Sequence, residues 1–348
     1  MPSLSFSVNA LIFLRKCLFA YTKAMRKIYT FIERAISKQI EKSNRMDIVN
    51  DLWSEKAKPE DWEKRKFVHW CVHPYVEKQH VNRMQSGDSE KSWFIYLKNK
   101  YIPKKLDYGL NLGCGSGWLE GLCLKHDICS RMDAFDIAVG AIEIAKKNAI
   151  AEKLEPFINY DIRDINKISL EQNKYDIIFT PSSAHHFKEL EHIFQEIHKS
   201  LKPEGLFVLV EYVGPSQFQW TDKQLGIIND LLKIIPAKYK NNISIPFTIK
   251  ECVERPSLEY MNTHDPSEAI RSAEIVPLIK KHFNIIEKRD FGGTLLNVLL
   301  HNIVGNFNEG NVEDIAFLEL LCYFERTLIA EKVLTSDFTF IIAKRVAK

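Results

Sequence analysis

The spacing of hydrophobic residues divides the chain near residue 106. Before that point, apolar residues recur every three or four positions, as they do on helices. Beyond it, short apolar runs alternate with longer segments of helical spacing. The short runs predict strands at 108–112, 132–135, 156–160, 175–180, 206–212, 283–288 and 338–344. Strands that alternate with helices indicate an α/β fold built on a parallel sheet.

The same pattern gives the organisation of the chain. Residues 1–48 form an arm, residues 49–105 a helical cap, and residues 106–348 the main domain. Within that domain, a helical segment interrupted by prolines, at about 214–281, is an insertion between the fifth and sixth strands.

Residues 10–36 of the arm have the spacing of an amphipathic helix. Its longest apolar run, Ala10–Leu14, is far shorter than the roughly 20 residues that span a bilayer. Peripheral contact with an anionic membrane, pairing with another helix, and packing on its own domain all remain open.

Charge is distributed unevenly along the chain. Residues 1–48 carry nine Lys and Arg against three Asp and Glu, whereas the remaining 300 residues carry 39 against 42. Proteins that bind nucleic acid usually have a basic surface, so a nucleic-acid substrate is disfavoured. The seven cysteines include no CxxC pair, which favours a cytoplasmic location, with membrane-peripheral attachment left open. His69, Cys71 and His73 lack a second ligand cluster, and no metal site is predicted.

The first predicted strand runs into the sequence NLGCGSG, residues 111–117. Such a loop lies at the carboxyl end of the sheet, where glycines let the backbone approach a ligand. A dinucleotide fingerprint requires a third glycine at position 118, which is Trp118, and a Walker loop requires a Gly-Lys-Ser/Thr sequence that the chain lacks. Neither of those nucleotide sites is supported.

Two acids follow the next strands. Asp136 comes about 20 residues after the glycines, where a carboxylate can bind both hydroxyls of a ribose; alternatively, it caps the following helix. Asp161 ends the third strand and suits the amine of a purine. Together these features indicate an adenosine-like ligand.

With these motifs in order, the chain resembles the class I S-adenosylmethionine-dependent methyltransferases, in particular their small-molecule branch. The matching segments are LDYGLNLGCGSGWLE, DAFDIA, YDIRD, YDIIFTPSSAHHF and HKSLKPEGLFVLVEY. The resemblance implies a Rossmann-like sheet of seven strands and S-adenosyl-L-methionine as cofactor. It also implies cofactor contacts from Asn111, Gly113, Cys114, Gly115, Gly117, Asp136, Ile137, Asp161, Ile162 and Ser182.

Asn111 departs from the family pattern, which usually has an acid at this position. An amide can bond the ammonium group of the cofactor directly or through water, but it supplies no opposite charge. A catalytically silent binding or scaffold protein is therefore one alternative function.

The resemblance places His185, His186 and Glu211 on the acceptor side, as candidate catalytic residues. A histidine there can take the proton of a hydroxyl acceptor; packing under the loop and helix capping are the other readings. Asp265 is expected to cap a helix that carries Glu268 and Arg271, and Gly292 and Gly293 either admit a substrate or form a turn.

The predicted function is methyl transfer to a small-molecule or glycan-like acceptor, on oxygen. An RNA methyltransferase is the third hypothesis, disfavoured because TPSSAHH stands where amine-methylating relatives have NPPY or DPPY.

Overall fold

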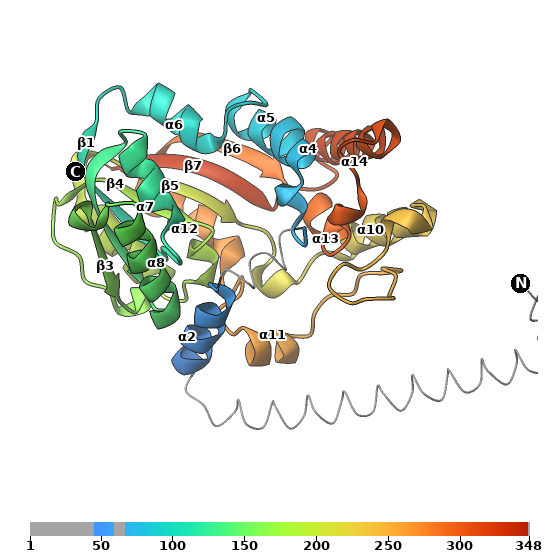
Figure 1. Ribbon diagram of the computed structural model, residues 1–348, viewed down its shortest axis with the longest axis horizontal. Helices are drawn as coiled ribbons and strands as arrows, with labels where there is room; N and C mark the ends of the chain where they lie inside the picture. The colour runs from blue at the N-terminus through green and yellow to red at the C-terminus, as the bar shows by residue number, and fades with distance from the viewer. Residues whose placement is uncertain (1–44, 59–66, 347–348) are drawn as a thin grey trace, which may run out of the picture. The chain divides into compact units, whose positions relative to one another are not determined.

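The computed structural model describes residues 45–58 and 67–346, so the helix expected at residues 10–36 lies outside the described residues. Seven strands form one mixed sheet in the order β3-β2-β1-β4-β5-β7-β6 (Figure 1). The strands are β1 Leu106–Leu112, β2 Cys129–Asp136, β3 Ile158–Ile162, β4 Tyr175–Pro181, β5 Leu201–Tyr212, β6 Phe283–Gly292 and β7 Phe338–Arg345.

The first five strands are parallel, and β7 pairs antiparallel with both β5 and β6. Because β1 pairs with both β2 and β4, the strand order reverses at β1, and ligands bind beside such a switch point in open α/β sheets. This is the Rossmann-like sheet of seven strands that the sequence predicts. The third strand begins at Ile158 rather than at Pro156, which lies in the 3-10 turn Glu155–Phe157.

Helices cover both faces of the sheet. One hydrophobic core lies under α9 and α12, and a second lies under α6, α7, α8, α10, α13 and α14. The longer helices are α2 Arg45–Lys56, α6 Trp93–Tyr101, α7 Trp118–Lys125, α8 Val139–Ala151, α9 Leu190–Ser200, α10 Asp222–Ile234, α12 Ile275–His282 and α14 Val312–Ala330. The shorter helices include η1 Trp70–Val72, α4 Pro74–Val76, the π-helix η2 Glu77–Asn82, α5 Arg83–Ser86, α11 Leu258–His264 and α13 Leu296–Leu300.

The sequence pattern explains why α9 packs as it does. Leu190, Ile193, Phe194 and Ile197 recur at three and four residues and are all buried, while polar side chains occupy the opposite face. The helix ends at Ser200, directly before β5 begins. This short connection fixes the orientation of β5, whose last residues reach the candidate site.

The helices α13 and α14, between β6 and β7, were not assigned from the sequence. Gly292 and Gly293 precede them and both have positive φ angles, 88° and 76°. The buried carboxylate of Glu325 on α14 accepts the N–H groups of Gly293, Leu295 and Leu296 at 2.7 to 3.0 Å. The glycine pair therefore forms a turn that α14 closes.

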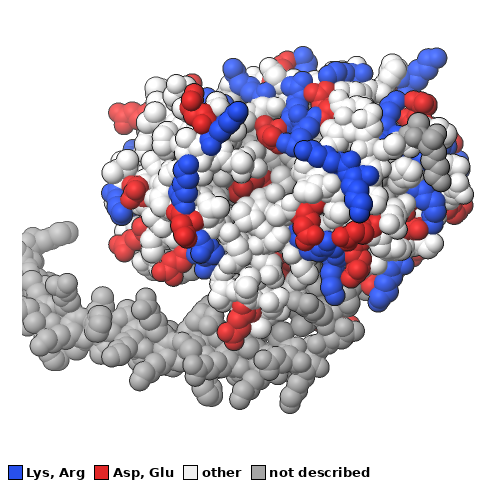
Figure 2. All heavy atoms as spheres, turned by 180° about the vertical axis from the view of Figure 1, so that it is seen from behind, with Lys and Arg blue, Asp and Glu red and all other residues white. Residues whose placement is uncertain are grey.

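None of the helices within residues 45–58 and 67–346 is long and apolar enough to cross a membrane. On the face shown in Figure 2, acidic side chains lie among the basic ones. This mixture agrees with the near-balanced charge of residues 49–348.

Candidate functional site

The loop between β1 and α7 is held against β2 by its backbone. The N–H groups of Gly113 and Cys114 both donate to the carbonyl oxygen of Phe135, at 2.8 and 3.2 Å. Gly113, Gly115 and Gly117 have φ angles of 75°, 53° and 81°, which side chains disfavour. A Cβ at Gly113 would lie 2.5 Å from Ser183 Cβ, and one at Gly117 would lie 2.5 Å from the Tyr160 hydroxyl.

Only Gly115 faces open space, with nothing within 4 Å of an added Cβ. The outer two glycines thus allow close packing within the protein. Cys114 is buried between them.

Asp136 ties this loop to the end of β2. Its Oδ2 accepts the N–H of Gly115 and its Oδ1 that of Ala138, both at 2.8 Å. The N-cap of α8 is Ala138, without a side-chain bond, so Asp136 is not the N-cap residue that was considered as an alternative. Burial raises the pKa of Asp136. Each carboxylate oxygen still has acceptor capacity for a ligand hydroxyl.

Asn111 and Glu120 form a second buried polar group behind the loop. The Nδ2 of Asn111 donates to Glu120 Oε1 at 2.6 Å, and both side chains are buried. The Oδ1 of Asn111 has no hydrogen-bond partner in the described part of the chain. An unpaired buried acceptor costs about 1 to 3 kcal/mol, so Oδ1 is suited to receive a ligand donor.

The pairing of β3 with β2 brings three further predicted cofactor residues, Asp161, Ile162 and Ile137, to the end of β2 beside Asp136. Asp161 pairs with Phe135 and Ile162 with Asp136, and Ile137 follows directly. Ile162 is 46% exposed, and Ile137 is half-buried. The carboxylate of Asp161 is bonded to Arg163 Nε at 2.8 Å, so it is partly engaged within the protein.

The end of β4 connects the glycine loop to the predicted acceptor side. Ser182 is exposed, with a φ angle of 52°, whereas Ser183 is buried. The hydroxyl of Ser183 donates to the Leu112 carbonyl at 2.8 Å, and its N–H donates to Glu211 Oε2 at 2.9 Å. This serine therefore links β1, β4 and β5.

Glu211 on β5 is a buried hub rather than an exposed group. Its carboxylate also accepts the N–H of Ala184 and of Tyr212, each at 2.7 Å, and the Nδ1–H of His185. Its side chain is fully buried, so it holds His185 in place from behind.

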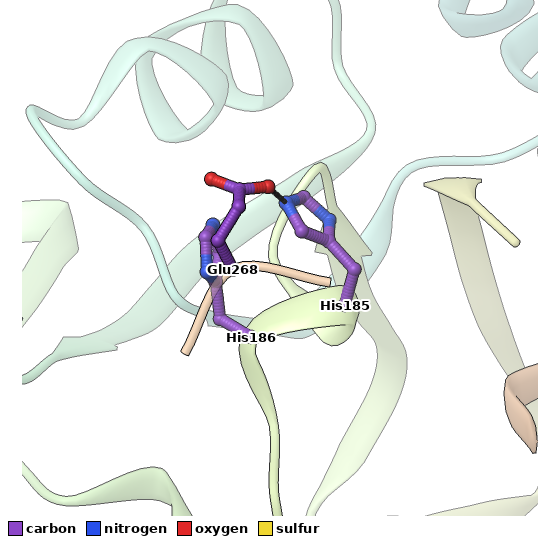
Figure 3. A group of neighbouring side chains, drawn as sticks. All are labelled: His185, His186 and Glu268. Atoms are coloured by element: carbon purple, nitrogen blue, oxygen red, sulfur yellow. Dashed lines mark ion pairs between the residues drawn. The ribbon is translucent and has the colours of Figure 1, made fainter. Parts of the chain in front are cut away.

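His185, His186 and Glu268 converge on the other side of this hub (Figure 3). One carboxylate oxygen of Glu268 lies 3.5 Å from His185 Nε2. His186 Nδ1 lies 3.1 Å from Ser267 Oγ, whose hydroxyl donates to Asp265 Oδ1 at 2.7 Å.

The helix expected to begin at Asp265 is not present, because Asp265 is the C-cap of α11 and closes a turn to Ser267. The turn is anchored by the Ile270 N–H, which donates to the His185 carbonyl at 3.1 Å. Arg271 points elsewhere and pairs with Glu191 and Glu274. Glu268 thus reaches the site, and Arg271 does not.

Charges around His185 set its protonation. Burial lowers its pKa, but Glu211, Glu268 and Asp265 outweigh that effect and raise the pKa to about 9. The pKa of His186 lies well below its usual value because of burial and the neighbouring charges of His185 and Lys56. Burial raises the pKa of Glu268. The cluster therefore combines a charged imidazole, a neutral imidazole and a carboxyl group that titrates closer to neutral pH.

Among the described residues, ligand atoms of His185, His186 and Glu268 lie within 4.8 Å of one another. Both nitrogens of His185 already face carboxylates, and the Lys56 ammonium acts on His186 and Glu268. We interpret the group as a proton-carrying cluster rather than as a metal site.

Three contributions to the site were absent from the sequence-based predictions. Nothing in the sequence indicated a role for Glu120, because a glutamate in the first turn of a helix is common. Trp53 and Lys56 come from α2: the Trp53 and His186 rings pack at 4.7 Å, and Lys56 lies 3.5 Å from Asp265. The packing of α2 against these distant residues could not be predicted, because no local pattern in the sequence indicates it.

Comparison with known proteins agrees with this geometry. The family described as "Methyltransferase domain" matches residues 110–209. A malonyl-[acyl-carrier protein] O-methyltransferase of Halalkalibacterium halodurans is 26% identical over 51% of this chain and 72% of its own length. A mitochondrial arginine-hydroxylase of Homo sapiens is 26% identical over 37% of this chain and 39% of its own length.

Among solved structures, a geranyl diphosphate C-methyltransferase from Streptomyces coelicolor A3(2), in complex with S-adenosyl-L-homocysteine, has a TM-score of 0.51. It is 11% identical, and the match covers 88% of this chain and 99% of that one. At this identity the likeness shows the fold.

The residues present fit the cofactor of this family. Asp136 is free to accept ribose hydroxyls, Gly115 leaves space above the loop, and Asn111 Oδ1 lacks a donor. Residues 110–209 match the methyltransferase-domain family, the sheet has the fold of the class I S-adenosylmethionine-dependent methyltransferases, and the cofactor is S-adenosyl-L-methionine.

Proposed function

We propose that this chain methylates an oxygen atom of a small-molecule or glycan-like acceptor, with Glu268 removing the acceptor proton beside the charged imidazole of His185. The observation that carries the proposal is the buried arrangement Glu211–His185–Glu268 at the end of β4. A hydroxyl acceptor must lose its proton on methylation, whereas the methyl transfer itself mainly requires alignment.

Each residue has a separate role in this arrangement. Glu211, held by three backbone N–H groups, orients the imidazole of His185. His185 presents its Nε2 beside Glu268 and is charged at neutral pH. Glu268 is the group with free capacity for a proton, because its carboxylate faces His185 and its pKa is raised by burial.

His185 alone is a weaker candidate for the base. With its pKa raised to about 9, it already holds its proton at neutral pH. The acceptor hydroxyl therefore donates toward Glu268, and the positive imidazolium stabilises the negative charge that develops on the acceptor oxygen.

The test uses the full chain and S-adenosyl-L-methionine labelled with ¹³C in the methyl group. The acceptors are separate sets of hydroxy lipids, acyl thioesters, phenols, isoprenoids and sugars. We expect one set to acquire a labelled O-methyl group, which the ¹³C chemical shift distinguishes from C-methyl and N-methyl products. Glu268→Gln should strongly reduce the product, while the exposed control Glu204→Gln should retain it.

A labelled C-methyl or N-methyl product would contradict the proposal. So would undiminished O-methyl product from Glu268→Gln. RNA is assayed as a separate acceptor, and if it were the only one labelled, the small-molecule assignment would be wrong.

A further inference from the structure

Glu120 is a buried acid that the acceptor chemistry does not use. It occupies the third position of α7, directly behind the glycine loop, and is fully buried. Its hydrogen-bond donors are Asn111 Nδ2 at 2.6 Å and the Tyr160 hydroxyl at 3.5 Å. Among the residues that the structure describes, neither Glu120 nor Asp136 has an ion-pair partner. A fully buried carboxylate and a half-buried one, neither with a cation beside it in the described part of the chain, favour a ligand that brings positive charge.

The bond to Glu120 also determines how the Asn111 amide is oriented. Since Nδ2 is committed to Glu120, the opposite end of the amide, Oδ1, is left buried and without a partner. Oδ1 is an acceptor only, so it requires an N–H or O–H donor. An ammonium group satisfies both needs, because it donates to Oδ1 and neutralises the carboxylate behind it.

We propose that Glu120 is the positioning residue for the ammonium group of S-adenosyl-L-methionine and acts through the Asn111 amide. The acid that position 111 lacks is thus supplied from α7, one side chain further from the ligand. The inference concerns cofactor binding alone and does not depend on the identity of the acceptor.

The protonation of Glu120 agrees with this geometry. Burial raises its pKa to about 7, against the lowering effect of its bonds to Asn111 and Tyr160, and the charge of Asp136 raises it further. The other titratable groups around it are Cys114, Cys123 and Tyr160, whose pKa values are all raised, so they stay neutral. A bound ammonium favours the charged form of Glu120, so binding below pH 7 must release a proton. Affinity should fall as the pH decreases through 7.

Calorimetric titration with two ligands tests the proposal without any turnover. S-adenosylhomocysteine carries the ammonium group, and 5′-methylthioadenosine has the same nucleoside and sulfur without the amino-acid part. We expect Glu120→Gln to weaken S-adenosylhomocysteine about tenfold at pH 8 and to leave 5′-methylthioadenosine unchanged. Glu152→Gln, an exposed glutamate that pairs with Lys125, is the control and should bind both ligands normally.

Asn111→Asp gives the sharper test. Placed beside Glu120, a second carboxylate forces one of the pair to hold a proton. We therefore expect Asn111→Asp alone to weaken S-adenosylhomocysteine, and the double variant Asn111→Asp/Glu120→Gln to bind within a few fold of the parent. Unchanged binding of 5′-methylthioadenosine by each variant shows that the variant is folded.

Three results would overturn the inference. The first is unchanged S-adenosylhomocysteine affinity for Glu120→Gln between pH 6 and 8. The second is an equal loss for both ligands, which indicates that Glu120 only supports the loop. The third is tighter binding by Asn111→Asp alone.

Discussion

The two sides of the site are built from different parts of the protein. The cofactor side is mainly backbone: a loop and three strand ends contribute N–H groups, carbonyls and open space, and its side chains include the carboxylates of Glu120, Asp136 and Asp161. The acceptor side is mainly side chains, with a histidine held between carboxylates from β5 and from the insertion. Under the proposed function, backbone geometry holds the cofactor, whereas side chains that include one from the insertion meet the acceptor.

The largest expected effect is on the acceptor side. His185→Asn should lower kcat by about 10² to 10⁴, since it removes the charged imidazole beside Glu268. S-adenosylhomocysteine should bind that variant within about twofold of the parent by calorimetry. His192→Asn, on α9 outside the cluster, is the control. Equal losses of turnover and of cofactor binding would show that the two sides are not separable.

A reciprocal effect is expected on the cofactor side. Asp136→Ala should raise the Kd of S-adenosylhomocysteine about 100-fold, because it removes ribose contacts and the bond that holds Gly115. Asp107→Ala, an exposed carboxylate at the start of β1, should bind normally. Calorimetry measures both, and an unchanged Kd for Asp136→Ala would contradict the assigned cofactor site.

The next largest effect is the fall of kcat/KM at low pH, which is the acid limb of the pH profile. Glu268 must be deprotonated to accept a proton, and burial raises its pKa, so kcat/KM should fall as the pH decreases through that raised pKa. The fall should approach tenfold per pH unit and begin at a higher pH than for an ordinary carboxyl group. Steady-state rates on the identified acceptor give the profile. In the residual activity of Glu268→Gln this limb should be absent, and its persistence would assign it to another group.

The smallest effect is predicted at Asp161. Its carboxylate is half exposed and already bonded to Arg163, so Asp161→Ala should weaken S-adenosylhomocysteine only about two- to fivefold. Competition binding resolves such a change. A loss as large as that of Asp136→Ala would show that the adenine side contributes more than this geometry indicates.

The cofactor side could be predicted because its signals are local. Strand, glycine loop and helix follow one another at 106–125, and parallel pairing then places Asp136 beside Ile162. Even there, the bond between Asn111 and Glu120 was missed, since it joins a strand to a helix face and leaves no motif. On the predicted acceptor side, the ends of β4 and β5 indicated His185 and Glu211, and the structure brings these two side chains together.

The remaining errors have a common physical origin. Asp265 has the sequence of a helix start, yet tertiary packing makes it the end of α11 and turns Glu268 toward His185. Lys56 contacts Asp265 in the same region, because α2 packs there. Contacts between segments about 80 to about 210 residues apart depend on how the elements pack, which local spacing does not encode.

The position of β7 in the sheet affects how the protein is made. This strand follows β6 in the sequence but lies between β5 and β6, so the long edge of β5 stays unpaired until residues 338–345 have been synthesised. The residues of β5 that lead to Glu211 then offer open backbone groups to any neighbouring chain. We expect the acceptor side to mature after the cofactor side during translation, and nascent chains that stop before residue 338 to be the species that most require a chaperone.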